Sequence, residues 1–505
     1  MDAHSATLTR GIRCAGDRPI TRRQALAAVA GLALTATLAA CGAPKASTPA
    51  PVSAVTSSSA AAARDGTSAA SAARSGTSAA SSVAAKAPAN GGVTINFLAR
   101  GDDYIFKLFR SQADEFNKTA PNITLSFQDV PGSWYQKLQA EIAGGTPPDA
   151  VFECDCSLGT SVRNKTMESL DAYLAKEKDF READFEPNSW FAMTYEGKRW
   201  GLPWDSGAYA LFFNHDLFQA AGVAVPDPTR RMTWDELIQL ARQLTVDQNG
   251  RTAVQSGFDP TKVSRYGFET NNAWGQANLI FSYGGELLNK DGTAPLDSSA
   301  AIDAIQLQAD MGTRYQIKAS PAYPQKGQTF GIQQKNVAIG YEGVWLLGRM
   351  NSAGIPWSTA PTPKHTQEVA GGHYSPLAML ATSKVKDATW QWLYWATLSD
   401  PGQRMLVEAG QMQPMRKSLL PLFVGLSKPP DKASRQVLVD ELAAPFLRVP
   451  GDHYGSYWGS YHDLWIQVSN KVLDPVYKGA KRASEIAPEL RREIELLLKT
   501  GVAPA

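Results

Sequence analysis

The larger part of the chain alternates between two hydrophobic periodicities. Apolar runs of strand length occur at Val93–Leu98 and Ile123–Phe127, whereas apolar positions recur at helical spacing over Phe106–Phe116 and Tyr135–Ala143. A short apolar run at Asp149–Phe152 follows a Gly-Gly-Thr-Pro-Pro break and indicates a buried strand. Strands that alternate with helices predict α/β layers around a largely parallel sheet.

The same alternation continues towards the C-terminus. Thr233 and Glu236 form a capping box, in which the threonine accepts from the amide three residues on and the glutamate reaches back, so we expect a helix over Asp235–Leu244. The patterns also predict strands at Tyr209–Phe213 and Val337–Gly340 and helices at Ala388–Leu398 and Ser484–Lys499. About 410 residues are more than one hydrophobic core usually holds, so two lobes are expected.

Residues 1–40 have the pattern of an export signal. Arg22 and Arg23 precede an uncharged run from Gln24 to Ala40, and small residues stand directly before Cys41. This order is typical of secretory signals, and the paired arginines favour the twin-arginine route. Small residues before a cysteine resemble a lipoprotein cleavage box, which implies that Cys41 becomes the lipid-bearing first residue of the mature chain. The run is mostly Ala and falls short of the ~20 strongly apolar residues of a transmembrane helix.

Residues 41–92 have the composition of a disordered stalk. The stretch from Gly42 to Gly92 is almost entirely Ala, Ser, Thr, Gly and Pro, and a near-repeat relates Ala63–Ala70 to Ala73–Ala80. Such a segment buries too little apolar area to offset its ordering entropy. As a flexible coil it would have an r.m.s. reach of about 40 Å.

The composition of the whole chain is that of an ordinary globular protein. Its 505 residues are 43% hydrophobic and 19% charged, with a net charge of +2 that gives no reason to expect nucleic acid. Of the cysteines, Cys14 lies in the leader and Cys41 at the expected lipid site, so Cys154 and Cys156 alone remain and a disulfide framework is excluded. The 13 Trp and 16 Tyr are more than core packing alone needs, so some of them are available to contact a ligand with flat apolar faces.

Catalytic and metal-binding motifs are missing from the sequence. There is no Gly-x-Ser-x-Gly elbow, no phosphate-binding loop and no His-Glu-x-x-His, and the six His show no clear metal-ligand pattern. Asp247–Gly250 and Asn289–Gly292 faintly resemble the starts of calcium loops, but both lack the downstream acidic ligand and are predicted to be tight turns. We therefore expect no metal and no cofactor.

Several segments occur in the order of a known family. They are Gly144–Val151, Gly201–Asp205, Tyr209–Gly222, Thr233–Leu237, Ala338–Trp345, Ser383–Leu398, Ser399–Gly402 and Gly410–Arg416. Together they resemble the signature of family 1 extracellular solute-binding proteins, the maltose-binding-protein-like sugar receptors of ATP-driven (ABC) importers. The resemblance spans Val93 to Leu498.

The resemblance implies a periplasmic-binding-protein fold of type II-like form, in which two α/β lobes joined by crossing strands enclose a ligand cleft. It assigns 93–205 and 372–425 to one lobe and 206–371 and 426–505 to the other. It places the crossings near Trp204–Ser206, Tyr374–Met379 and Val424–Lys432. Short crossings at a few positions suit a hinge that shuts on a ligand.

A sugar site needs aromatic rings against C–H faces and polar groups around a rim of hydroxyls. Trp345 is the first aromatic candidate, because it follows a strand and a Gly and is expected at a strand end facing the cleft. Trp274 and Trp458 are the other two aromatic candidates. For each ring the alternative is ordinary core packing.

The polar candidates lie at expected strand ends and crossings. Asp205 follows Pro203-Trp204 at the first crossing, where both lobes meet the ligand. Asp102 and Asp103 follow the first strand, a common place for ligand contacts in α/β folds, and one of them is expected to cap the next helix instead. The remaining candidates are Asp155, Glu342 and Arg416.

Cys154 and Cys156 lie two residues apart on a segment expected to be extended, so they point the same way. A Cys-x-Cys disulfide is geometrically tight, and a twin-arginine substrate folds first in a reducing compartment. Two buried thiols are therefore expected, with a disulfide as the alternative.

Two functions follow. The first is a monomeric, lipid-anchored receptor on the outer face of the cytoplasmic membrane or in the periplasm. It captures a sugar or oligosaccharide, delivers it to ABC permease subunits and catalyses nothing. The second is an exported carbohydrate-active enzyme such as a glycosidase, which would require two carboxyls ~5–10 Å apart across the scissile bond. The sequence contains no pair of acidic residues at helix or strand spacing that requires the enzyme function.

Overall fold

The computed structural model describes residues 92–132, 134–270, 274–448 and 468–500. The predicted signal of residues 1–40, the lipid site Cys41 and the stalk up to residue 91 lie outside the described residues. Within the described ranges, no helix combines the length and apolar character needed to cross a membrane.

A ten-stranded mixed sheet runs through this part of the chain, in the order β2-β1-β3-β11-β6-β9-β8-β7, with β10 added to β6 and β12 to β11. Its strands are β1 Val93–Arg100, β2 Ile123–Val130, β3 Ala150–Phe152, β6 Leu202–Asn214, β7 Val246–Asp247, β8 Val263–Thr270, β9 Val337–Gly343, β10 Trp357–Ala360, β11 Ala370–Met379 and β12 Leu447–Arg448. A separate two-stranded ribbon joins β4 Thr194–Tyr195 to β5 Lys198–Arg199.

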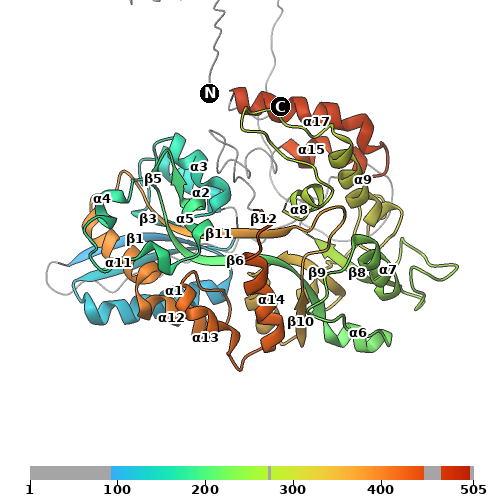
Figure 1. The fold of residues 1–505 in the computed structure, drawn as a ribbon, viewed down its shortest axis with the longest axis horizontal. Helices are drawn as coiled ribbons and strands as arrows, with labels where there is room; N and C mark the ends of the chain where they lie inside the picture. The colour runs from blue at the N-terminus through green and yellow to red at the C-terminus, as the bar shows by residue number, and fades with distance from the viewer. Residues whose placement is uncertain (1–91, 133, 271–273, 449–467, 501–505) are drawn as a thin grey trace, which may run out of the picture. The chain divides into compact units, whose positions relative to one another are not determined.

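Helices cover both faces of the sheet; in Figure 1, α2 and α3 lie above the strands and α1 and α12 below them. The helices are α1 Asp103–Thr119, α2 Trp134–Ala143, α3 Asp155–Arg163, α4 Asp171–Leu174, α5 Pro187–Met193, α6 His215–Ala221, α7 Trp234–Leu244, α8 Trp274–Ser282, α9 Ser299–Thr313, α10 Leu346–Ser352, α11 Lys386–Leu398, α12 Asp400–Ala409, α13 Leu420–Val424, α14 Lys432–Leu442, α15 Asn470–Val472, α16 Asp474–Tyr477 and α17 Ala483–Thr500. Short 3-10 turns occur at Glu182–Asp184, Ile332–Gln334 and Lys417–Leu419. The predicted α/β class is confirmed.

Two long buried strands join the two halves of the sheet, which we call the β1 half (β2, β1, β3) and the β9 half (β9, β8, β7). Strand β6 pairs antiparallel with β11 over Leu202–Ala208 and then with β9 over Tyr209–Phe213. Strand β11 pairs on its other edge with β3. All residues of both strands are buried. The chain therefore passes between the halves on two buried strands, whose pairing has one register shift between Ser375 and Pro376.

The expectation of a largely parallel sheet is wrong. Parallel pairing is confined to β1–β2, β1–β3, β8–β9 and the short β11–β12 contact, whereas every other strand pair is antiparallel. The physical reason lies in β6 and β11. A strand that returns from one half to the other runs against its neighbours and needs no crossover helix.

The buried side chains form two hydrophobic clusters, of which the first extends from the β1 half to β10 and α10 and the second lies around β9 and α7. In the first cluster, the ring of Phe109 on α1 stacks on Trp204 of β6 with centroids 4.5 Å apart. The Trp204 indole donates to Gln112 at 3.2 Å, and Gln112 donates to the carbonyl of Gly402 at 2.8 Å. Helix α1 is thereby fixed to β6 and to α12 by apolar contact and by satisfied buried polar groups.

In the β9 half, the predicted capping box is confirmed. The hydroxyl of Thr233 accepts from the amide of Glu236 at 3.2 Å, and the Glu236 carboxylate accepts from the amide of Thr233 at 2.8 Å. The buried face of α7 consists of Trp234, Leu237, Ile238, Ala241 and Leu244. Asp247 accepts from the amides of Asn249 and Arg251, as in the tight turn expected there.

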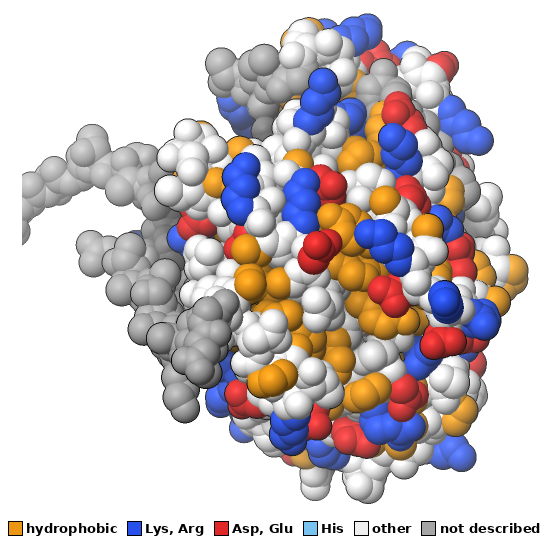
Figure 2. All heavy atoms as spheres, turned by 90° about the vertical axis from the view of Figure 1, so that its left-hand side faces the viewer, with side chains coloured by type: hydrophobic (Ala, Val, Ile, Leu, Met, Phe, Trp, Pro, Cys, Tyr) orange, Lys and Arg blue, Asp and Glu red, His pale blue; other side chains and the backbone are white. Residues whose placement is uncertain are grey.

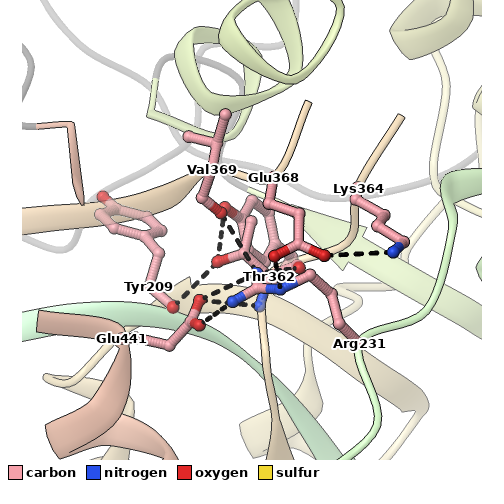
Figure 3. A network of polar contacts seen from close by, with 8 residues as sticks. Tyr209, Arg231, Thr362, Lys364, Glu368, Val369 and Glu441 are labelled. Atoms are coloured by element: carbon pink, nitrogen blue, oxygen red, sulfur yellow. Dashed lines mark hydrogen bonds and ion pairs between the residues drawn. The ribbon is translucent and has the colours of Figure 1, made fainter. Parts of the chain in front are cut away.

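A buried ion pair ties α14 to the strands that join the halves (Figure 3). Arg231 pairs with Glu441 of α14 and donates to the carbonyls of Thr362 at 2.6 Å and Val369 at 3.3 Å. Glu441 accepts from the amide of Thr362 at 3.0 Å, and the Thr362 hydroxyl donates to the carbonyl of Tyr209 on β6 at 3.2 Å. The exposed side-chain fractions of Arg231 and Glu441 are 13% and 3%, and the more exposed Glu368 lies 3.9 Å from Arg231 as a second acid.

The surface mixes charges of both signs. On the face shown in Figure 2, at the β1 end of the sheet, Lys and Arg side chains are interspersed with Asp, Glu and hydrophobic side chains rather than gathered in one basic field. This face lacks the continuous positive surface by which proteins bind nucleic acid backbones.

We predict that Glu441→Ala lowers the free energy of unfolding by about 3 kcal/mol, because Arg231 keeps only the more distant and exposed Glu368 as a counter-charge and the Thr362 amide loses its acceptor. Urea denaturation measures the change. The control is Glu489→Ala on the exposed face of α17, which should change the same free energy by less than about 0.5 kcal/mol. A loss below about 1 kcal/mol for Glu441→Ala would show that the network does not hold α14 in place.

Candidate functional site

A cavity of about 320 Å³ lies between the β1 half and the β9 half, over β6 and β11. The carboxyl ends of β1, β3 and β9 all contribute to its wall, which is where open α/β sheets bind ligands. Its lining comprises Arg100, Gly101, Asp102, Tyr104, Ile105, Phe152, Cys154, Cys156, Asp205, Glu342, Trp345, Arg349, His373, Ser375 and Met412. Four of the predicted site residues meet here: Asp102 follows β1, Asp205 lies on β6, and Glu342 and Trp345 lie at the end of β9.

Trp345 stands at the N-terminal end of α10, two residues after β9 ends. Its half-buried ring meets the ring of Tyr209 edge-on at 5.4 Å and that of His373 at 4.7 Å. A Cβ on Gly343 would lie 2.3 Å from the Trp345 ring, so the glycine is what lets the ring fold back against the strand. The indole is thus held on its protein side while its remaining surface borders the cavity.

Asp205 lies on β6 opposite Ser375 of β11 and is completely buried. Burial raises the pKa of Asp205 to about 7, and the nearby Ser375 hydroxyl, Arg100 and the Ser375 amide oppose that rise. Neither Asp205 oxygen accepts a hydrogen bond of regular geometry. A buried carboxyl with this unused acceptor capacity, in the wall of a cavity, is suited to hydroxyl groups of a bound solute.

Arg100 is a site residue that sequence reasoning missed. It ends β1, donates to the carbonyl of Glu153 at 2.9 Å and to the Ser375 hydroxyl at 3.1 Å, and lies 4.3 Å over the Phe152 ring. Burial lowers the pKa of Arg100, while Asp205, Glu153 and Asp155 act in the opposite direction. Its position at the end of the first predicted strand could have indicated a site residue, but the prediction favoured the acids Asp102 and Asp103 that follow it.

Asp155 is the first residue of α3, and its buried carboxylate accepts from the amide of Tyr374 on β11 at 2.9 Å. Burial raises the pKa of Asp155 to about 7; the Tyr374 amide, Arg100 and the Cys156 amide oppose the rise, and Asp205 adds to it. Asp155 does not itself line the cavity, whereas its neighbours Cys154 and Cys156 do. Its contacts anchor the end of β3 to β11.

Asp102 and Arg349 connect α1 to α10 across the cavity. The Arg349 Nε lies 2.6 Å from an Asp102 carboxylate oxygen, and the Tyr104 hydroxyl donates to the carbonyl of Trp345 at 3.0 Å. Asp102 occupies the backbone cap position of α1, but its side chain makes no cap bond to that helix. The carboxylate is engaged by Arg349 instead, and the sequence contained no signal for this pairing.

The structure brings the other candidates elsewhere. Asp103 is exposed on the first turn of α1 and does not line the cavity. Arg416 lies 3.5 Å from Asp400 and 3.9 Å from Asp184 and is outside the lining, because these surface acids hold it. Trp274 begins α8, but its side chain is not described, and Trp458 lies outside the described residues.

His373 is a second residue that the sequence did not reveal. It lies on β11, and burial lowers the pKa of His373 to about 3, so its imidazole is neutral at physiological pH. A Cβ on Gly207 would lie 2.1 Å from the His373 ring, so this close packing requires a glycine on β6. The signal was weak because the Gly-Gly-His-Tyr-Ser-Pro sequence breaks the usual strand pattern.

Cys154 and Cys156 form a disulfide, so the expectation of two buried thiols is wrong. The expected extended segment is wrong as well, because α3 begins at Asp155. The helical turn brings the two Cα atoms to 5.1 Å, within the range that a disulfide spans, whereas residues two apart in a strand are separated by roughly 6.6 Å.

Among the described residues, Cys154, Asp155 and Cys156 are the group of His, Cys, Asp or Glu side chains close enough to hold a metal ion together. Metal binding by cysteine requires the thiolate, and these two sulfurs are bonded to each other. The oxidised site therefore does not fit a metal.

The family model of bacterial extracellular solute-binding proteins matches residues 103–403. A putative binding protein of Brucella abortus is 31% identical over 210 residues, which are 40% of this chain and 46% of that relative, so the matched segment spans about half of its length. The lactose-binding protein of Rhizobium radiobacter is 26% identical over 373 residues, or 69% of this chain and 81% of the relative.

The fold also matches that of a solved structure. The substrate-binding protein Lmo0181 of Listeria monocytogenes, in complex with cycloalternan, superimposes with a TM-score of 0.70 at 19% identity, over 81% of this chain and 99% of that one. The expected periplasmic-binding-protein fold is confirmed.

We predict that Asp205→Asn removes a pH-dependent part of the stability. Because the pKa of Asp205 is raised, the folded state holds a proton that the unfolded state releases; the associated stabilisation is complete below about pH 4 and is lost as the pH rises to about 7. The unfolding free energy of the variant minus that of the wild type should therefore rise by up to about 4 kcal/mol between pH 4 and pH 7.5.

Urea titrations at the two pH values measure this difference. The matched control is Asp103→Asn on the exposed first turn of α1, which should change the unfolding free energy by less than about 0.5 kcal/mol. A flat difference for Asp205→Asn would mean that its carboxyl is ionised in the folded protein throughout this range.

Proposed function

The chain belongs to the family of bacterial extracellular solute-binding proteins, and on that premise we propose that it is the receptor of an ABC importer for a sugar or oligosaccharide. The family consists of binding proteins rather than enzymes, so the glycosidase alternative is set aside. The solute would bind in the cavity between the β1 half and the β9 half. Closure of the halves around it would produce the form that the permease recognises.

The observation that carries this proposal is the meeting of Trp345 with Asp205 in one cavity. An aromatic ring can cover the C–H face of a sugar, and a buried carboxyl can accept hydrogen bonds from its hydroxyls. Arg100, Glu342 and Arg349 border the same space and add donors and acceptors for the rim. Few apolar side chains besides Trp345 are needed, because a sugar is polar around most of its edge.

The charges of the lining favour a neutral solute over a phosphorylated one. Arg349 is paired with Asp102, and Arg100 is engaged by the Glu153 carbonyl and by Ser375. Glu342 adds a carboxylate to the same wall, and Asp205 adds a carboxyl whose pKa burial raises to about 7. Phosphate binding relies on cations or amides whose charge is not already balanced, whereas acids lie beside both arginines here.

Two relatives support the carbohydrate assignment. The Rhizobium radiobacter protein is named for lactose, and the Listeria monocytogenes protein is bound to cycloalternan, a saccharide. Both identities are low, so they support the class of ligand and leave its identity open. Lactose and maltose are suitable first probes.

The remaining parts of the proposal rest on the sequence. We propose that residues 1–40 direct export by the twin-arginine route, that Cys41 carries the lipid and that residues 41–92 form the tether. Two discontinuous lobes, 93–205 with 372–425 and 206–371 with 426–505, would move about the crossing strands. A tether would keep the receptor close to its permease and raise its effective concentration there.

We predict that a panel of neutral sugars including lactose and maltose contains a ligand that raises the melting temperature, with no products formed, and that sugar phosphates do not. A ligand at 100 times its Kd should stabilise the fold by about 2.7 kcal/mol. In calorimetric titration, Trp345→Ala should weaken binding of that sugar by more than about tenfold, because the ring contact is lost.

The control is Trp395→Ala, which changes a half-buried tryptophan of α11 outside the cavity and should leave the Kd unchanged. An unchanged Kd for Trp345→Ala would remove this ring from the site. Release of products from any sugar in the panel would contradict the receptor function itself.

We also predict that Cys41→Ser abolishes lipid attachment and shifts the exported protein from the membrane fraction to the soluble fraction. Fractionation and fatty-acid labelling of cells that produce either form measure the change. Cys14→Ser is the control, since that residue lies in the predicted leader. Equal labelling of wild type and Cys41→Ser would contradict the proposed anchor.

A further inference from the structure

The Cys154–Cys156 disulfide lies in the wall of the ligand cavity. It is placed where β3 ends and α3 begins, with Cys154 at the cap position of the helix. The Cys154 sulfur accepts from the amide of Cys156 at 3.2 Å, and Cys156 is 4% exposed. Neither the family match nor the proposed function assigns a role to this bond.

The segment that carries the disulfide is fixed to the strand β11. The amide of Glu153 donates to the carbonyl of Pro376 at 2.9 Å, and the Tyr374 amide donates to Asp155 at 2.9 Å. Arg100 adds a hydrogen bond to the Glu153 carbonyl, and Ser157 donates to the Glu153 carboxylate at 2.6 Å. The two sulfurs are therefore held in a set place relative to the strands that join the halves.

The chemistry of a disulfide differs from that of the charged and polar part of the surrounding wall. Two sulfurs and two methylene groups form an apolar, polarisable surface with no strong hydrogen-bond donor. Much of the remaining lining is charged or polar: Arg100, Asp102, Asp205, Glu342, Arg349, His373 and Ser375. The disulfide comes from the β1 half, and the ring of Trp345 comes from the β9 half.

We propose that the Cys154–Cys156 disulfide is a ligand-contacting surface that packs against the C–H face of a sugar ring, so that affinity depends on its oxidation state. The proposal rests on the sugar-binding function proposed above. Reduction by an external dithiol breaks the S–S bond: two electrons and two protons pass to the sulfurs, and the reductant becomes a disulfide. The product is two separate thiols, whose S–H groups replace the single apolar surface.

The test uses the full chain with Cys14→Ser and Cys41→Ser, so that thiol counts report on residues 154 and 156 alone. Thiol titration of the unfolded, exported protein should find no free thiol before reduction and two afterwards. The probe is whichever of lactose or maltose gives the larger stabilisation. Its Kd should be about fivefold higher for the reduced protein than for the oxidised protein, and saturating sugar should slow reduction of the bond by about the same factor.

Protection by the sugar separates a contact from a merely structural bond, because a bond remote from the solute would be reduced equally fast with and without it. The matched control is Cys154→Ala/Cys156→Ala, whose Kd should not respond to reductant. A second variant, Cys154→Ser/Cys156→Ser, should bind as weakly as the reduced protein while its melting temperature without sugar shows that it is folded.

Each contrary result has a distinct meaning. Two free thiols in the exported protein, an equal Kd in both oxidation states, or reduction at an unchanged rate in the presence of sugar overturns the role of the disulfide and leaves the receptor function standing. Failure of both sugars to bind the oxidised protein overturns the proposed ligands and, with them, the contact assigned to the disulfide.

Discussion

The antiparallel pairing of β6 with β11 is the constraint on which the site depends. Both strands are buried throughout, and their paired segments supply Asp205, His373 and Ser375 to the base of the cavity. The backbones approach so closely here that Gly207 has no room for a Cβ beside the His373 ring. The register shifts between Ser375 and Pro376, which accommodates a proline within a central strand.

The electrostatics of the cavity follow from that burial. Asp205 and Asp155 are removed from water together, so burial raises the pKa of each, and Arg100 supplies the opposing charge. Arg100 is itself held by neutral acceptors, the Glu153 carbonyl and the Ser375 hydroxyl, so it does not form a closed ion pair with either acid. The buried Asp205 carboxyl can therefore still accept hydrogen bonds from a solute. A hydrogen bond to a solute hydroxyl contributes most free energy in such a place, because water is excluded from it.

The sequence predicted the parts of the fold that are governed by local patterns. Strands β1 and β2, helix α1 and the capped helix α7 lie where periodicity placed them, because each has a clear apolar face or run. Strand β11 was not predicted as a whole, since Gly371, Gly372 and Pro376 are unfavourable in strands and only its tertiary pairing with β3 and β6 stabilises it.

The same division applies to the site. Trp345 and Asp205 were found because they lie within segments that resemble a family signature. Arg349 was not, because its role arises from Asp102, which is 247 residues away in sequence and belongs to a different half of the sheet. The turn that bonds Cys154 to Cys156 was missed because two cysteines two apart read as extended until the start of α3 is known.

Among the described residues, the contacts across the cavity are weak compared with those beneath it. The Asp102–Arg349 pair has side chains 38% and 37% exposed, and ion pairs at that exposure contribute about 0–1 kcal/mol. The Tyr104 bond to the Trp345 carbonyl adds one hydrogen bond, worth about 1 kcal/mol. Beneath the cavity, by contrast, β6 and β11 pair from Leu202 to Ala208 with a single register shift. Breaking these two contacts across the cavity therefore costs little free energy. Pulling the β1 half away from the β9 half would instead break the pairing of β6 with β11. A solute that contacts both Asp205 and Trp345 needs to contribute only a few kcal/mol of binding free energy to set how closely the two walls approach. This small requirement is the energetic condition for a hinge that closes on its ligand.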